Sequence, residues 1–278
     1  MLATLLIIFR EMIEAGLIVG IVLAATKGVP LRGFWVGYGV AGGVAGACII
    51  ALFAGTIASL FAGTGQELFN AAILLLAVAM LTWHNVWMAS HGREIAQEMK
   101  SVGSEVASGN RTLTALAIVV GVAVLREGSE VVLFLYGIAA SGDTSATAMM
   151  MGGVGGIAGG VLVSALLYFG LLTIPTHRLF SVTSSLITLL AAGLAAQAIQ
   201  YIQQAGYLRV LTTRLWNSSL LLDEHSLIGQ MLHTLVGYVA KPTGAQLLAY
   251  LATVILIVGL MRLTRTKPLA HPRSALAE

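Results

Sequence analysis

Charged residues are scarce in this chain. Asp, Glu, Lys and Arg make up 10% of its 278 residues, whereas hydrophobic residues make up 58%. A soluble domain usually carries about 25% charged and about 45–50% apolar residues. So few charges cannot cover the surface of a soluble protein of this length, which excludes a cytosolic enzyme. The high apolar content also excludes intrinsic disorder, so the composition indicates an integral membrane protein.

The chain has a single cysteine and lacks a Walker nucleotide-binding motif. The single cysteine, Cys48, excludes a disulfide within the chain and a cysteine cluster for zinc or iron–sulfur. Its apolar surroundings predict a buried, inert thiol. The sequence has no Walker phosphate-binding motif, so we do not expect the chain to hydrolyse ATP itself. The net charge of +3 reflects where Lys and Arg lie along the chain and indicates no nucleic-acid partner.

Long apolar runs, by contrast, fill most of the sequence. A membrane-spanning helix needs about 20 mostly apolar residues. Seven stretches meet this length: 2–26, 33–62, 66–90, 112–140, 147–173, 181–205 and 246–262. The second and fifth are rich in glycine, which lets helices approach closely in lipid, so we expect them to be central packing helices. The predicted fold class is an all-α integral membrane protein with seven transmembrane helices.

The positions of Lys and Arg predict how these helices are oriented. With the N-terminus outside, ten of the 15 basic residues lie in inward connections or in the C-terminal tail, and three lie in outward connections. Basic residues are enriched on the inner side of a membrane. We therefore expect the N-terminus outside and the C-terminus inside.

The sequence also repeats itself at a distance of 116 residues. This shift places the three charges of one motif on those of another: Arg10, Glu11 and Glu14 on Arg126, Glu127 and Glu130. Two copies of a three-helix unit are therefore predicted. Because each copy crosses the membrane an odd number of times, the second copy begins on the opposite side and is inverted. Inverted repeats are common in secondary transporters, whose substrate sites lie near the midplane. The predicted organisation is a single permease domain, 1–278, with repeat one 1–90, repeat two 112–205, an outward loop 206–245, a seventh helix 246–262 and a basic inner tail 263–278.

The six charges of the two motifs lie deep inside apolar stretches. Ionisable groups at the centre of a bilayer cost about 2.5–3.5 kcal/mol each, so they indicate function. At 100° per residue, the arginine and both glutamates of each motif share one face of a helix. If the two faces meet, four carboxylates and two guanidinium groups surround one point with a net charge of −2. Such a site favours a hard, oxygen-preferring cation; alternatively, the charges only lock the repeats together as salt bridges.

This Arg-Glu-x-x-Glu motif, once in the first and once in the fourth apolar stretch, resembles that of the high-affinity iron permeases, the oxidase-dependent iron transporters. Similarities to bacterial members extend over nearly the whole chain, at residues 66–69, 82–83, 87–88, 191–196, 225–227 and 237–238. Two positions depart from the family pattern. Met12 stands where glycine is usual, as at Gly128, and Asn70 stands where relatives often have a second acid.

The resemblance implies a function and assigns residues to it. It makes four glutamates the iron ligands and two arginines their partners: Glu11, Glu14, Glu127 and Glu130, with Arg10 and Arg126. It implies iron import across the plasma membrane, the inner membrane in a bacterium. A separate extracytoplasmic ferroxidase or delivery protein would oxidise Fe(II) before Fe(III) passes through. Iron is then the substrate, and no organic cofactor is expected. The chain itself is expected to be a transporter and not an enzyme. Its other expected contacts are membrane lipid and further copies of the chain in a homo-oligomer.

Other polar residues are candidates for a secondary path of the ion. Glu67 begins the third apolar stretch, where a solvated end residue is the simpler interpretation. His84 lies deep in the same stretch and could be a ligand or a hydrogen-bonded packing residue. Asp223, Glu224 and His225 in the outward loop could collect metal at the mouth, although exposed acids beside histidine are common without one.

Two other classes of function stay open at this point. A transporter of another cation, such as Mn²⁺ or Pb²⁺, could use the same carboxylates. A membrane-embedded di-iron enzyme is the more distant alternative, because such centres usually add histidine in a Glu-x-x-His arrangement. Neither motif has that arrangement.

Overall fold

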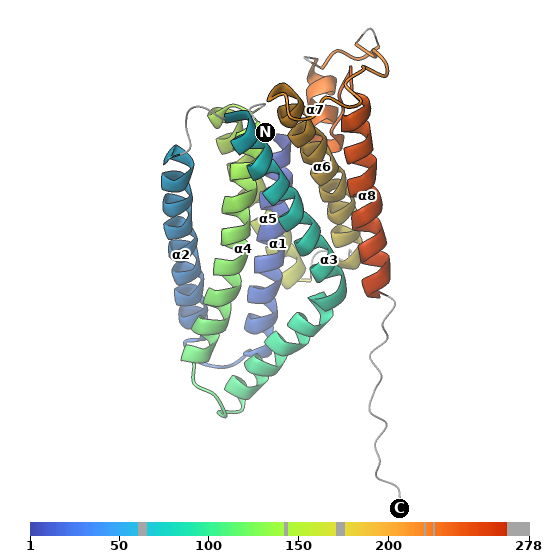
Figure 1. The fold of residues 1–278 in the computed structure, drawn as a ribbon. Helices are drawn as coiled ribbons and strands as arrows, with labels where there is room; N and C mark the ends of the chain where they lie inside the picture. Colours follow the sequence, from blue (N-terminus) through green and yellow to red (C-terminus); the bar gives the residue numbers. More distant parts are fainter. Residues whose placement is uncertain (61–65, 142–143, 171–175, 220, 225, 266–278) are drawn as a thin grey trace, which may run out of the picture.

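The computed structural model describes residues 1–60, 66–141, 144–170, 176–219, 221–224 and 226–265. These ranges contain helices and no β-strand, so the predicted all-α class is confirmed there (Figure 1). The helices are α1 (Leu2–Ala25), α2 (Arg32–Leu60), α3 (Gln66–Ala107), α4 (Thr114–Ser141), α5 (Ala146–Tyr168), α6 (Thr176–Gln204), α7 (Leu227–Val236) and α8 (Gly244–Arg265).

Within the described residues, five helices contain a stretch long and apolar enough to cross a membrane. The stretches are Arg32–Ala54, Glu67–Gly92, Ala146–Tyr168, Phe180–Gln204 and Gly244–Thr264. Each overlaps one of the predicted apolar stretches. Helices α1 and α4 are of similar length, with 24 and 28 residues. Their apolar runs are interrupted by the three charges that each motif carries.

Helix α3 extends well beyond its predicted end at residue 90. It continues to Ala107 and contains 42 residues, a length of about 63 Å at 1.5 Å per residue. Its lower part turns toward the start of α4 (Figure 1). This part is more polar than a membrane span, but Met99, Val102 and Val106 are buried. The apolar run therefore predicted the helix only as far as residue 90.

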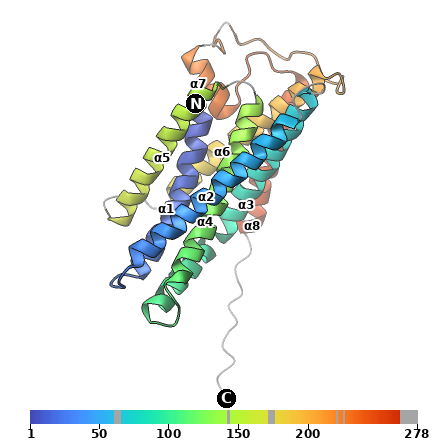
Figure 2. The ribbon, with the colours of Figure 1, turned by 90° about the vertical axis from the view of Figure 1, so that its left-hand side faces the viewer.

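The two glycine-rich helices lie at the periphery of the bundle, so their predicted central position is wrong. Helix α2 packs along α4, and α5 packs along α1 (Figures 1 and 2). A Cβ on Gly43 would lie 2.7 Å from the carbonyl oxygen of Gly121. A Cβ on Gly156 would lie 2.8 Å from the carbonyl oxygen of Leu5. Glycine does permit close packing, as expected, but each helix uses it against one main neighbour.

The prediction that Cys48 is buried is also wrong. Helix α2 turns its glycine side to α4, while Cys48 is exposed. Its apolar neighbours belong to a helix face turned away from the bundle, and sequence alone does not distinguish that face from a protein interior.

The connections divide the bundle into two ends. Helix α1 begins at the end where α7 lies, which we call the N-terminal end (Figure 1). The α1–α2 turn and the α3–α4 connection lie at the opposite end. These connections carry Lys27 and Arg111, and α2 begins there with Arg32. We call this the basic end.

Two clusters of buried apolar side chains fill the bundle. The first core lies toward the N-terminal end and contains Ala3, Ile7, Leu74, Ala77, Leu81, Phe134, Ile138, Ile187, Leu190, Ala191, Leu194, Ala198 and Ile257. The second core lies toward the basic end and contains Ala15, Val22, Val36, Met99, Val106, Leu116, Val120 and Val124. Along α1, α3 and α4, the residues between the two cores include the motif charges and His84.

Candidate metal centre

Each motif forms the same local ion pair. Residues four apart lie on one face of an α-helix, and in α1 Arg10 Nε donates to Glu14 Oε1 at 2.8 Å. In α4, Arg126 Nε donates to Glu130 Oε1 at 3.3 Å. In each helix the arginine and the second glutamate therefore lie on one face, as helix geometry predicts.

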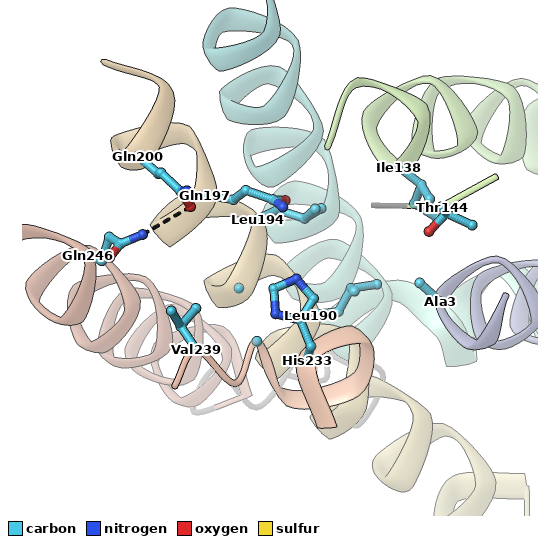
Figure 3. Close-up of a pocket in the computed structure, with 12 residues that line it drawn as sticks. Ala3, Ile138, Thr144, Leu190, Leu194, Gln197, Gln200, His233, Val239 and Gln246 are labelled. Carbon is cyan, nitrogen blue, oxygen red and sulfur yellow. Dashed lines mark hydrogen bonds between the residues drawn. The ribbon is translucent and has the colours of Figure 1, made fainter. Parts of the chain in front are cut away.

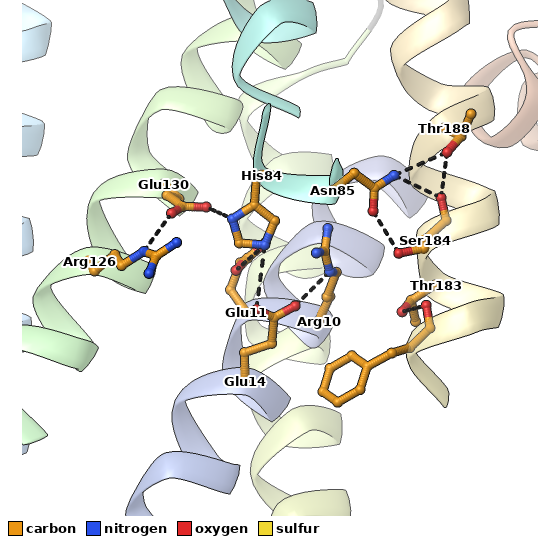
Figure 4. Close-up of polar contacts among 11 residues, drawn as sticks. Arg10, Glu11, Glu14, His84, Asn85, Arg126, Glu130, Thr183, Ser184 and Thr188 are labelled. Atoms are coloured by element: carbon orange, nitrogen blue, oxygen red, sulfur yellow. Dashed lines mark hydrogen bonds and ion pairs between the residues drawn. The ribbon is translucent and has the colours of Figure 1, made fainter. Parts of the chain in front are cut away.

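His84 of α3 lies between the two motifs (Figure 4). Its Nδ1 contacts Oε2 of Glu130 in α4. Its Nε2 lies 3.4 Å from Glu14 Oε2 and 4.0 Å from Glu11 Oε2, both in α1. One imidazole therefore contacts glutamates of both motifs.

The side chains that could hold a metal form one compact group, which we call the centre. Glu11, His84, Glu127 and Glu130 each offer one ligand atom, and these atoms all lie within 4.8 Å of one another. Glu14 borders this group, because one of its oxygens is bonded to Arg10 and the other faces His84. The structure thus brings together three of the four predicted glutamates, with the fourth beside them. It adds a histidine that the sequence placed only on a secondary path.

The group is buried, and its carboxylates are incompletely paired. Glu11, His84 and Glu127 are at most 3% exposed. In the described part of the chain, neither carboxylate oxygen of Glu11 has a hydrogen-bond partner, and nor does Oε2 of Glu127. A buried carboxylate without a partner is strongly destabilising. These oxygens therefore mark a position that a cation would stabilise.

The two arginines have unlike surroundings. Arg10 is 1% exposed, whereas 37% of the Arg126 side chain is exposed. The Arg126 guanidinium lies over the ring of Trp87 in α3, 3.9 Å from its centroid, and Trp87 in turn stacks on His91 at 5.1 Å. The sequence did not predict a role for this tryptophan at the centre. The available signal was its position three residues after His84, on the same side of α3.

Asn85 fixes α3 to α6 directly beside the centre. Its Nδ2 donates to the Ser184 carbonyl at 3.1 Å and to Thr188 Oγ1 at 3.0 Å. Its Oδ1 accepts from Ser184 Oγ at 2.6 Å. Asn85 is 1% exposed, so these buried hydrogen bonds hold the segment of α3 that carries His84 (Figure 4).

The unusual residue of the first motif is accommodated outside the group. Met12 packs against Gly160 of α5, where a Cβ would meet the methionine side chain. Gly128 of the second motif faces Ala47 of α2 instead. The larger residue in α1 is therefore matched by a glycine in its neighbouring helix.

The other predicted candidates do not join the centre. Glu67 is exposed in the first turn of α3, about 25 Å along the helix from His84. Asp223 is exposed, and Glu224 is half-buried and accepts a hydrogen bond from the Ala240 backbone. His225 lies outside the described residues.

A small cavity of about 50 Å³ lies closer to the N-terminal end, beside α7 (Figure 3). Its polar lining comprises Thr144, Gln197, Gln200, His233 and Gln246. Leu190, Leu194 and Ile138 line the cavity and also belong to the first core. The cavity therefore borders the first core, and none of the motif glutamates lines it.

Comparison with known proteins gives a consistent assignment. Residues 1–267 match the Iron permease FTR1 family. The ferrous iron permease EfeU of Escherichia coli O157:H7 is 32% identical over 247 residues, which is 87% of this chain and 88% of that protein. The ferrous iron permease EfeU of Yersinia pestis is 32% identical over 254 residues, which is 90% of this chain and 89% of that protein. No solved structure matches the chain.

Proposed function

The chain belongs to the iron permease FTR1 family, and from this membership we propose that it imports iron through the carboxylate centre between α1, α3 and α4. The observation that carries the proposal is the set of buried glutamate oxygens without a hydrogen-bond partner, at Glu11 and Glu127. The permease names of the family and of its relatives indicate a transporter and not an enzyme.

In this proposal the four motif glutamates are the ligands of the ion in transit. Two of them, Glu14 and Glu130, are each held by an arginine, while Glu11 and Glu127 have no arginine partner and have oxygens without a hydrogen bond. When iron arrives, its charge replaces that of the guanidinium groups, and the arginine-held carboxylates turn to the ion. With all four glutamates and both arginines charged, the site carries −2, so a divalent ion would leave it neutral and Fe(III) would leave it at +1; hard cations favour such oxygen ligands.

The proposed architecture has α1 and α4 crossing the membrane with the five apolar helices, as two inverted repeats, 1–90 and 112–205. The packing of α1 on α5 and of α4 on α2 supports it. In both pairs the first helix of one repeat packs on the second helix of the other repeat. The remaining parts are the loop 206–245, a seventh span at 246–262 and the tail 263–278. Rocking of one repeat against the other would open the centre to each side in turn.

We further propose that the N-terminal end faces outward and the basic end faces the cytoplasm, in the plasma membrane or, in a bacterium, the inner membrane. The basic residues in the connections of the basic end support this orientation, because basic residues are enriched on the inner side of a membrane. The names of the E. coli and Yersinia relatives support iron reaching the protein as Fe(II). A separate ferroxidase outside would oxidise it, and Fe(III) would pass the glutamates.

The test is metal uptake into proteoliposomes that contain the full chain, with Fe(II), Fe(III), Mn²⁺, Zn²⁺ and Pb²⁺ offered separately. Glu11→Gln and Glu127→Gln should abolish iron uptake, and Glu14→Gln and Glu130→Gln should reduce it strongly. Glu98→Gln is the matched control, because this glutamate is exposed and lies about 21 Å along α3 from His84, and its uptake should equal that of the natural chain.

Undiminished iron uptake in folded Glu11→Gln and Glu127→Gln variants would overturn the proposal and reduce the motifs to structural salt bridges. Uptake of Mn²⁺ or Pb²⁺ in preference to iron would replace iron as the substrate but keep the glutamates as its site.

A further inference from the structure

We propose that His84 is itself a ligand of the transported ion and that its imidazole gives the centre its preference for iron over Mg²⁺, Ca²⁺ and Mn²⁺. This inference rests on the proposed function, because it assigns the selectivity of the same centre. It concerns a residue of α3, outside both repeated motifs.

The position of His84 supports a ligand role. Both ring nitrogens face carboxylates, Nδ1 toward α4 and Nε2 toward α1. The side chain is 2% exposed, and one of its nitrogens lies within 4.8 Å of ligand oxygens of Glu11, Glu127 and Glu130. An ion that binds these three oxygens therefore lies within reach of the imidazole.

The chemistry of the donor set gives the selectivity. Carboxylate, carbonyl and water ligands suit Mg²⁺, Ca²⁺ and Mn²⁺, whereas imidazole suits iron, zinc, copper and nickel. A centre of glutamates alone would accept the abundant hard cations as readily as iron. One nitrogen donor among three carboxylates shifts the preference toward iron. It also disfavours Mn²⁺, which is a possible substrate of a site made of carboxylates alone.

Asn85 serves as a positioning residue for this ligand. Its amide is bonded to Ser184 and Thr188 of α6 on both its donor and its acceptor side. It therefore fixes the height and rotation of α3 at the adjacent His84. Residues that orient a metal ligand typically contribute about 10–100-fold to metal affinity.

The first experiment detects the ligand directly in the full-length protein. The probe is Cu²⁺ at one ion per chain, because Cu²⁺ binds nitrogen and oxygen sites most tightly among the divalent first-row metals. Pulsed EPR of the natural chain should show the nitrogen couplings of a bound imidazole. His84→Gln should lose them, and His91→Gln should keep them; His91 is the matched control, an exposed histidine on the same helix.

The second experiment measures selectivity by equilibrium binding of Fe²⁺ under anaerobic conditions, with Mn²⁺ or Mg²⁺ as competitor. Fe²⁺ has the same charge as both competitors, so a preference for it reports the donor atoms and not the charge of the ion. His84→Gln should weaken Fe²⁺ binding by about tenfold or more and change Mn²⁺ binding far less. Asn85→Ala should weaken Fe²⁺ binding while the imidazole couplings persist. That combination would identify positioning and not ligation as the role of Asn85.

The outcomes separate this inference from the proposed function. If the natural chain shows no imidazole couplings, or if His84→Gln keeps the preference for Fe²⁺ over Mn²⁺, the role of His84 is overturned while the glutamate site stands. If Glu127→Gln leaves Fe²⁺ binding unchanged, the glutamate site itself fails, and the selectivity proposal fails with it.

Discussion

The two arginines of the centre illustrate how burial decides what a single charge contributes. Arg10 is enclosed and bonded to Glu14 at 2.8 Å. Arg126 is over a third exposed, bonded to Glu130 at 3.3 Å and covered on one face by Trp87. Removing one partner from a buried ion pair leaves the other charge without compensation. The same motif therefore has different energetics in α1 and in α4.

We predict that Arg10→Gln destabilises the protein more than Arg126→Gln does. The first change leaves the Glu14 carboxylate buried and without its arginine, at a cost of about 3–5 kcal/mol. The second removes a longer and more exposed ion pair and should cost clearly less. Thermal unfolding of the two variants in the same detergent gives the comparison. Equal losses of stability would show that burial does not distinguish the two motifs.

Trp87 is predicted to stabilise Arg126 through its ring face. Trp87→Leu should lower stability by about 0.5–2 kcal/mol, the range for a cation–π interaction, and Trp87→Phe should recover part of the loss. Trp83→Leu is the matched control, since Trp83 lies one turn earlier in α3 and is 72% exposed. Thermal unfolding checks both changes, and equal effects at the two tryptophans would rule out a specific role for Trp87.

The predictability of these residues depended on how local their contacts are. The pairing of Arg10 with Glu14 follows from the repeat of a single helix, so the sequence predicted it. The position of His84 follows from how α3 docks between α1 and α4. No periodicity encodes that long-range contact, so the sequence offered His84 only as one of several secondary candidates.

At the scale of the helix, the glycine stripes show both the use and the limit of sequence patterns. The stripes predicted close approach, and α2 and α5 do approach α4 and α1 closely through Gly43 and Gly156. They did not predict that both helices lie at the periphery. A glycine stripe indicates the distance to one neighbour and contains no information on how many neighbours a helix has.

We predict that Gly43→Ala is destabilising. Its Cβ would lie 2.7 Å from the Gly121 carbonyl oxygen and 2.7 Å from the Val124 Cβ, so α2 and α4 must separate, at a cost of about 1–3 kcal/mol. Gly42→Ala is the control, because nothing lies within 4 Å of its Cβ position and alanine favours a helix over glycine. It should be neutral or slightly stabilising in thermal unfolding. Equal effects would contradict close packing at Gly43.

At the scale of the whole molecule, a cluster of buried apolar side chains lies on either side of the centre. The first core lies toward the N-terminal end, and the second core lies toward the basic end. Met99 and Val106, in the extension of α3 beyond the predicted span, supply part of the second core. Under the proposed transport each side opens in turn, and we predict that the extension of α3 moves away from α1 when the ion leaves at the basic end.

A reversible cross-link tests this movement. A Cβ on Gly103 would lie 2.5 Å from the Ala25 Cβ, and a disulfide needs about 3.5–4.5 Å between Cβ atoms, so a small separation allows the bond. We predict that oxidation of an Ala25→Cys/Gly103→Cys chain, made in a Cys48→Ser background, stops iron uptake into proteoliposomes, and that reduction restores it. The Cys48→Ser chain alone should be insensitive to oxidant. Uptake by the cross-linked chain at the rate of the reduced one would show that the ion leaves without separation of α3 from α1.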